Sequence, residues 1–145
     1  TIVHLPHVDK PKGIRRTIDI IKEVGANPDR VIIDHNTEDT MAISRESGCW
    51  SGMTVYPISK LTPQRVSDII REYGSDRMIV NGSADWGVSD PLSLVKVANH
   101  MAGDGHSEET VKRLVFENAM AFYGQSEKWK PELDLVPIDP SVFQR

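Results

Sequence analysis

Four short apolar runs recur along the chain, and each is followed by a longer stretch in which apolar residues return at helical spacing. The runs are rich in β-branched residues and apolar on both faces, which is typical of parallel strands covered by helices. They predict strands at residues 2–3, 31–33, 53–56 and 78–80. The alternation of strand and helix predicts a parallel α/β fold.

Helix start and stop signals mark the stretches between the strands. Thr62 and Pro63 supply a hydroxyl N-cap and a proline at the first helical position. Gly74 then stands where a left-handed residue commonly ends a helix. Further helices are predicted at 14–24, after Thr37, at 90–102 and after Ser107.

Two parallel architectures accommodate four strand–helix units: an open doubly wound sheet, and an arc of a closed (β/α)8 barrel, which needs about 250 residues when complete. The chain has 145 residues, so the second interpretation makes it half of a barrel. We expect residues 1–125 to form this partial barrel and the proline-containing residues 126–145 to form an irregular extension. Because Thr1 already lies beside a predicted strand, we expect the chain to be a fragment of a longer protein.

Composition and charge restrict the classes of partner. The charged fraction of 26% is typical of a soluble globular protein, and the net charge of −4 gives no support for a surface that coats nucleic acid. No apolar run approaches the roughly 20 residues that a membrane-spanning helix needs. Cys49 is the single cysteine, so an internal disulfide is impossible and a cytoplasmic location is the simplest expectation.

Polar residues with useful chemistry follow the predicted strands. Loops after parallel strands open on one face of the sheet, so these residues are expected to converge although they are distant in sequence. They are His4 with His7, Asp34 with His35, Tyr56, and Asn81 with Asp85. Imidazole nitrogens and carboxylate oxygens bind catalytic divalent cations such as zinc. The sequence therefore indicates a metal site at the strand ends, with hydrogen-bonded structural histidines as the alternative.

Four segments carry a resemblance to a known family. Residues 31–38 (VIIDHNTE), 48–54 (GCWSGMT), 81–87 (NGSADWG) and 117–124 (ENAMAFYG) resemble the later part of TatD-like metal-dependent hydrolases of the amidohydrolase superfamily. The resemblance implies that the chain is the C-terminal half of a TIM-type barrel, strands five to eight. It also implies an enzyme that uses one or two divalent ions, Zn, Mn or Mg.

The resemblance assigns roles to three residues. His4 corresponds to the metal histidine of strand five and His35 to that of strand six. Asp85 follows the eighth strand, where the family has an aspartate that binds metal and takes the proton from the attacking water. Asp34 is interpreted as a partner that orients an imidazole, because alternation along a strand would point only one of Asp34 and His35 inward. His7 is either a substrate contact or a solvated loop residue.

These assignments predict hydrolysis of an ester, amide or phosphodiester bond by metal-activated water, with a small molecule as substrate. Nucleic acid is not favoured, because residues 36–39 replace the histidine and aromatic motif of the nuclease members. A half-barrel also leaves two sheet edges unpaired, which favours a homo-oligomer. One alternative is a non-catalytic, flavodoxin-like α/β module that binds a small anionic ligand or a protein partner. Another is an enzyme-derived scaffold without activity.

Overall fold

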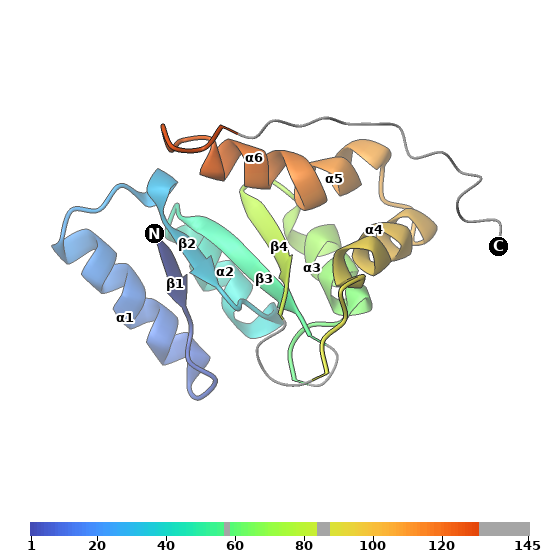
Figure 1. The fold of residues 1–145 in the computed structure, drawn as a ribbon. Coiled ribbons are helices and arrows are strands. Elements are labelled where there is room, and N and C mark those ends of the chain that lie inside the picture. The colour runs from blue at the N-terminus through green and yellow to red at the C-terminus, as the bar shows by residue number, and fades with distance from the viewer. Residues whose placement is uncertain (57–58, 84–87, 131–145) are drawn as a thin grey trace.

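The computed structural model describes residues 1–56, 59–83 and 88–130. Within these ranges the chain forms a four-stranded parallel sheet whose strands follow each other in chain order (Figure 1). The strands are β1 (Ile2–His4), β2 (Ile32–Asp34), β3 (Trp50–Val55) and β4 (Met78–Gly82). The edges of this sheet are β1 and β4. The prediction of a parallel α/β fold is confirmed.

Helices connect the strands and surround the sheet. They are α1 (Lys10–Glu23), α2 (Glu38–Glu46), α3 (Pro63–Tyr73), α4 (Ser93–Gly103), α5 (Glu108–Lys112) and α6 (Asn118–Tyr123), with a 3-10 turn η1 (Pro28–Arg30) and a π-helical turn η2 (Arg113–Glu117) that joins α5 to α6. In Figure 1, α1 lies beside β1, α3 and α4 lie beside β4, and α5 and α6 lie across the end at which the strands begin. The predicted cap of α3 is present, because Thr62 Oγ1 accepts a hydrogen bond from the Arg65 backbone N–H at 3.3 Å.

One face of the sheet packs against the helices through two apolar clusters. The first joins β3 and β4 to α2, α3 and α4, and its buried members include Met53, Val80 and Ile69. The second joins β2 to α1 and includes Ile33 and Ile14. Burial of this apolar surface is the main stabilising contribution, at about 25 cal/mol for each Å² removed from water.

The opposite face is apolar where the strands begin. Ile32, Trp50 and Ile79 pack there with Phe122 of α6, and the rings of Trp50 and Phe122 meet edge to face with centroids 5.5 Å apart. Trp50 also donates from its indole N–H to the Asp29 carbonyl at 3.1 Å. Apolar packing therefore covers this face where the strands begin.

The same face becomes polar where the strands end. Side chains alternate along a strand, so positions two or four residues beyond the apolar layer point to the same side. They carry Asp34, Thr54 and Asn81. His4 pairs in register with Asp34, and Thr54 pairs with Asn81. Residues from four strands are thus set side by side at one end of the sheet.

The third strand starts earlier than predicted. The apolar run predicts a strand at 53–56, whereas β3 spans Trp50–Val55. Ser51 interrupts the apolar pattern, but it is fully buried and its hydroxyl forms a 2.8 Å hydrogen bond with the hydroxyl of Ser44 in α2. A buried hydrogen-bonded serine is compatible with a core strand, and a hydropathy pattern does not reveal such a partner.

The fourth helix starts later than predicted. The sequence predicts a helix at 90–102, whereas α4 spans Ser93–Gly103. Asp90 Oδ1 accepts a hydrogen bond from the Leu92 backbone N–H at 3.0 Å. Asp90 therefore forms a local turn before the helix instead of capping its first turn, a competition that is common for aspartate.

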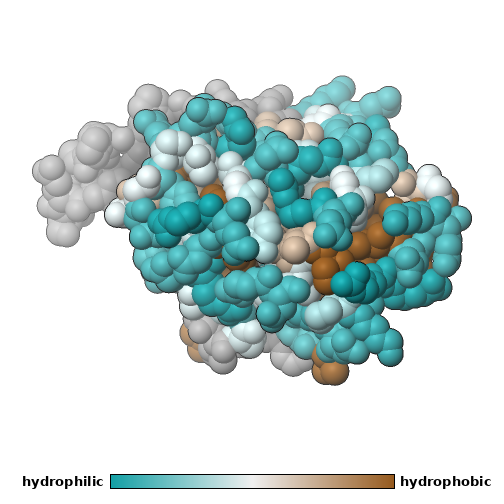
Figure 2. Space-filling model, turned by 180° about the vertical axis from the view of Figure 1, so that it is seen from behind, coloured by the Kyte–Doolittle hydropathy of each residue, from teal (hydrophilic) through white to brown (hydrophobic). Residues whose placement is uncertain are grey.

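Residues 126–130 of the predicted extension form no helix or strand, and residues 131–145 lie outside the described part. None of the helices in the described ranges has the length and apolar character needed to span a membrane. Seen from behind, the described surface is mostly hydrophilic, with restricted apolar areas (Figure 2).

Candidate metal centre

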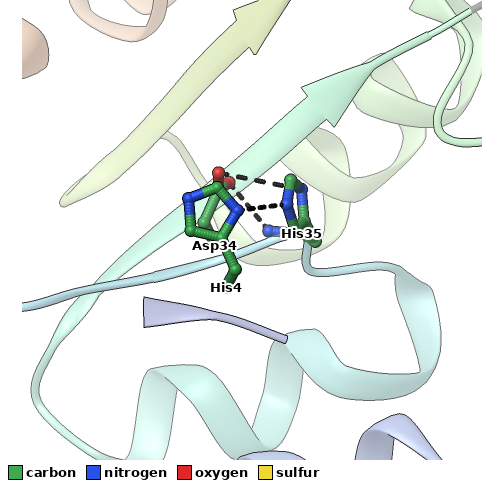
Figure 3. A group of neighbouring side chains, drawn as sticks. All are labelled: His4, Asp34 and His35. Atoms are coloured by element: carbon green, nitrogen blue, oxygen red, sulfur yellow. Dashed lines mark hydrogen bonds and ion pairs between the residues drawn. The ribbon is translucent and has the colours of Figure 1, made fainter. Parts of the chain in front are cut away.

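Two imidazole rings from neighbouring strands face each other at the polar end of the sheet (Figure 3). His4 is the last residue of β1, and His35 directly follows β2. His4 Nδ1 lies 2.8 Å from His35 Nε2. Asp34 lies beside both, and one potential ligand atom of each of the three residues lies within 4.8 Å of the others. The structure therefore brings together the two histidines that the sequence singles out.

His35 reaches this cluster because its backbone is left-handed, with φ of 68°. β2 ends at Asp34, so the chain turns at His35 and the alternation of a strand no longer applies. The expectation that only one of Asp34 and His35 points to the site is therefore wrong, since both contribute to the cluster. A left-handed conformation costs a non-glycine residue roughly 1–2 kcal/mol, and such strain concentrates at functional sites.

Asp34 is buried, and three hydrogen bonds converge on its Oδ1. Its Oδ1 accepts from the His35 backbone N–H at 2.7 Å, from Asn81 Nδ2 at 3.2 Å and from Thr54 Oγ1 at 3.3 Å. Its Oδ2 accepts from Asn81 Nδ2 at 3.4 Å and lies 3.7 Å from His35 Nδ1. Because these donors already occupy Oδ1, the arrangement supports Asp34 as a residue that orients its neighbours, as the sequence predicts.

Gly52 makes room for this carboxylate. A Cβ at position 52 would lie 3.0 Å from Asp34 Cα and would clash with Asp34 Oδ1. Only a residue without a side chain therefore lets Asp34 take its position between β2 and β3. A glycine inside a strand commonly marks a close approach of another group, but the sequence does not reveal which group approaches Gly52.

The two ring nitrogens of His35 have different partners. Nδ1 lies 2.7 Å from Thr54 Oγ1, and Nε2 faces His4. Burial lowers the pKa of His35; the Asp34 carboxylate opposes this shift, and positive charge at Lys60 adds to it. A lowered pKa favours the neutral imidazole, which is the form that binds a metal ion.

Two lysines reach the site, Lys10 from the start of α1 and Lys60 from the loop between β3 and α3. Lys10 Nζ donates to the His35 carbonyl at 2.8 Å, and Lys60 Nζ donates to Ser83 Oγ at 3.2 Å. Both line a small hollow beside His35, together with His7, Asn36, Thr37, Thr54 and Leu61. Burial lowers the pKa of Lys10, and the positive charges of Arg65 and Lys60 lower it further. Cationic side chains therefore gather at the mouth of the candidate site, and His7 lies among them.

Several of these residues carry no signal in the sequence that would have identified them. Thr54 lies in β3, and Lys60 lies in the loop between β3 and α3. The only signal in the sequence is that Lys60 follows a predicted strand. Asp85, the predicted third ligand and proton acceptor, lies outside the described residues. Away from the strand ends, His106 Nε2 lies 2.9 Å from Ser67 Oγ in α3.

The donor set fits a divalent cation of the zinc or manganese type. Two imidazole nitrogens point at each other with no protein atom between them (Figure 3), and a carboxylate lies next to both. Ligand nitrogens about 2.0–2.1 Å from a tetrahedral zinc ion would lie about 3.3 Å apart. The observed separation of 2.8 Å requires only a small opening. His4 is exposed and can provide that movement.

A parallel sheet thus carries two histidines and a buried aspartate at its carboxyl end, a donor set that could hold a metal ion. No family model matches the chain. Among curated proteins, the chain is similar to an uncharacterized metal-dependent hydrolase of Methanocaldococcus jannaschii, with 29% identity over 124 residues that cover 84% of this chain and 48% of that protein.

Among solved structures, the chain is similar to the TatD-like protein of Archaeoglobus fulgidus. The TM-score is 0.62 with 28% identity, and the match covers 83% of this chain and 45% of the other. The chain thus spans about half the length of both proteins. Both comparisons confirm the resemblance to TatD-like metal-dependent hydrolases.

Proposed function

We propose that this chain carries the metal-binding half of the active site of a hydrolase. His4 and His35 bind a divalent cation through Nδ1 and Nε2, and the carboxylate of Asp85 completes the set of ligands from this chain. The observation that carries the proposal is the 2.8 Å approach of these two nitrogens at the carboxyl end of a parallel sheet. When bound, the cation supplies water activated for attack on an ester, amide or phosphodiester bond.

Other residues of the chain have roles in proton transfer, orientation of the ligands and substrate binding. Asp85 accepts a proton from the attacking water, a role that suits a carboxylate with a second free oxygen. Asp34 orients His35, and His7 contacts the substrate at the hollow that it lines. Lys10 and Lys60 surround the same hollow, so a small molecule with a negatively charged group is the favoured substrate. Attraction between unlike charges in such a recess strengthens binding more than it would in bulk water.

We also propose that residues 1–125 form strands five to eight of a (β/α)8 barrel, with 126–145 as an extension. Two observations support this proposal. The four parallel strands follow each other in chain order, and the chain matches less than half of a TatD-like structure. The flavodoxin-like alternative is less compatible with this strand order, because a doubly wound sheet reverses its order at a switch point. The other half-barrel would pair with the sheet edges and supply further ligands.

Calorimetric titration of the chain with Zn²⁺ and Mn²⁺ tests the metal site. We expect binding to the unmodified chain and at least tenfold weaker binding after His4→Gln or His35→Asn, because each removes one ligand nitrogen. Lys12→Gln, on the exposed part of α1, is the control for nonspecific effects. Equal affinity in all four proteins would refute the proposed ligands.

Turnover tests the hydrolase assignment in the protein that contains both halves of the site. A panel of carboxylic esters, lactones and phosphodiesters with Zn²⁺ or Mn²⁺ covers the bonds considered. Asp85→Asn keeps the size of the side chain but removes its capacity as a base, so we expect turnover to fall by about 100-fold or more. Unchanged turnover in Asp85→Asn would rule out this residue as the proton acceptor.

A further inference from the structure

Thr54 contacts both His35 and Asp34 in the candidate site. Its Oγ1 lies 2.7 Å from His35 Nδ1 and 3.3 Å from Asp34 Oδ1. Thr54 is buried, with 2% of its surface exposed, so water does not compete freely for these contacts. A threonine hydroxyl has one hydrogen to donate and lone pairs to accept. The direction of its hydrogen bond therefore determines which nitrogen of His35 carries a proton.

The surroundings of Asp34 fix that direction. Asp34 Oδ1 accepts from the His35 backbone N–H and from Asn81 Nδ2, two groups that can only donate. The carboxylate therefore acts as an acceptor toward Thr54 as well. If the hydroxyl pointed instead to His35, lone pairs of Thr54 would face Asp34 Oδ1, and Asp34 Oδ2 would face an unprotonated Nδ1 from 3.7 Å. Both contacts would be repulsive in a buried environment.

We propose that Thr54 is the positioning residue that sets the tautomer of His35, by donating its hydrogen to Asp34 and accepting the hydrogen of His35 Nδ1. The chain Asp34–Thr54–His35 then leaves a lone pair on Nε2. This nitrogen is the one that faces His4 Nδ1 at 2.8 Å. With a proton on Nε2 instead, the ring would present a donor to a cation and could not bind it.

The importance of the His35 tautomer for metal binding rests on the proposed function. The role of Thr54 in setting that tautomer does not depend on it. His4 needs no such support, because it is exposed and can exchange its proton with solvent. His35 is mostly enclosed and has a left-handed backbone, so a wrong tautomer could not be corrected by a simple turn of the side chain. The partners that a ligand histidine finds for its second nitrogen commonly fix its tautomer and orientation.

Nitrogen-15 NMR of the histidine rings in the metal-free chain, at a pH above 7, tests the proposal directly. Long-range proton–nitrogen correlations distinguish a protonated from an unprotonated ring nitrogen. We expect His35 to carry its proton on Nδ1 in the unmodified chain. We expect Thr54→Val, which keeps the shape but loses the hydroxyl, to shift His35 toward a mixture or toward the other tautomer. Thr54→Ser restores the hydroxyl and should restore the original tautomer.

The spectrum of the unmodified chain tests the proposal even if Thr54→Val does not fold. A proton on His35 Nε2 in this spectrum overturns the proposal. An unchanged His35 tautomer in a folded Thr54→Val protein overturns it as well. Calorimetry with Zn²⁺ provides the second readout, for which we expect Thr54→Val to weaken binding by about 10–100-fold and Thr54→Ser by much less. If the unmodified chain binds no Zn²⁺, the proposed metal site is refuted. The NMR result then still tests whether Thr54 sets the tautomer of His35.

Discussion

Gly52 and Asp34 lie so close across the β2–β3 pair that a Cβ at position 52 would come within 3.0 Å of Asp34 Cα. The absence of a side chain on β3 is therefore a condition for the position of the buried carboxylate, and through it for the orientation of His35 and Asn81. One inconspicuous strand residue supports several polar contacts of the candidate site.

Gly52→Ala is expected to damage both the fold and the site. The added methyl group must displace Asp34, and overpacking of this kind typically costs about 1–3 kcal/mol. We expect a lower midpoint in thermal unfolding and weaker Zn²⁺ binding by calorimetry. Gly103→Ala is the matched control, because a Cβ there meets no atom within 4 Å and the residue ends a helix. A Gly52→Ala protein as stable as the unmodified chain would show that Asp34 can move without cost.

The left-handed backbone of His35 predicts a difference between two substitutions. Asparagine tolerates this conformation better than alanine does. We therefore expect His35→Asn to be more stable than His35→Ala by roughly 0.5–1 kcal/mol, while both lose Zn²⁺ affinity to a similar extent. Chemical denaturation and calorimetry on the same two proteins measure the two effects separately. Equal stability of the variants would indicate that the backbone relaxes away from its left-handed conformation after substitution.

The lysines at the mouth of the site predict a preference for charged substrates. In the protein with both halves of the site, we expect Lys10→Gln or Lys60→Gln to raise KM about three- to tenfold for an ester that carries a negative charge, since an interaction of about 1 kcal/mol between partly exposed charges corresponds to roughly a fivefold change. The KM for a neutral ester with the same leaving group should change little. Lys12→Gln removes the same charge from α1 outside the hollow and serves as control. An equal rise of KM for both esters would argue against charge recognition.

The contact between α2 and α3 predicts a contribution to stability that depends on pH. Arg65 donates to both carboxylate oxygens of Glu38, at 2.8 and 2.6 Å, and these hydrogen bonds lower the pKa of Glu38. Because the pKa is lower in the folded state, the contribution is complete above the unfolded pKa near 4.5 and is lost as the pH falls through the folded value. Both side chains are partly exposed, so we expect no more than about 1 kcal/mol.

Glu38→Gln should therefore reduce the free energy of unfolding at pH 7 and make little difference at pH 3. Denaturant titrations across this range measure the effect. Glu46→Gln removes a carboxylate from the same helix, where the described residues show no ion pair to it, and should leave the pH profile nearly unchanged. A Glu38→Gln protein with an unaltered profile would show that the bond to Arg65 contributes nothing to stability.

Local patterns in the sequence predicted the elements of the fold well. The apolar runs and caps located all four strands and the start of α3, because strand burial and N-capping depend on neighbours in the chain. The side-chain amide of Asn118 donates to the carbonyls of Ser75 and Met78 at 2.6 and 2.7 Å, partners that lie far from it in the sequence. The pattern did not predict the early start of β3, because the hydrogen-bond partner of the buried Ser51 lies on another element.

The sequence by itself determined that His4 and His35 lie at strand ends of a parallel α/β fold. Hydrophobic periodicity and the alternation of strands with helices can be read from neighbouring residues in the chain. Only the tertiary structure decided that Asp34 and His35 point to the same place, that Gly52 leaves room for the carboxylate, and that Thr54 lies between them. These relations depend on a backbone dihedral angle and on distances between strands, which arise when the sheet packs and have no signature in any single segment.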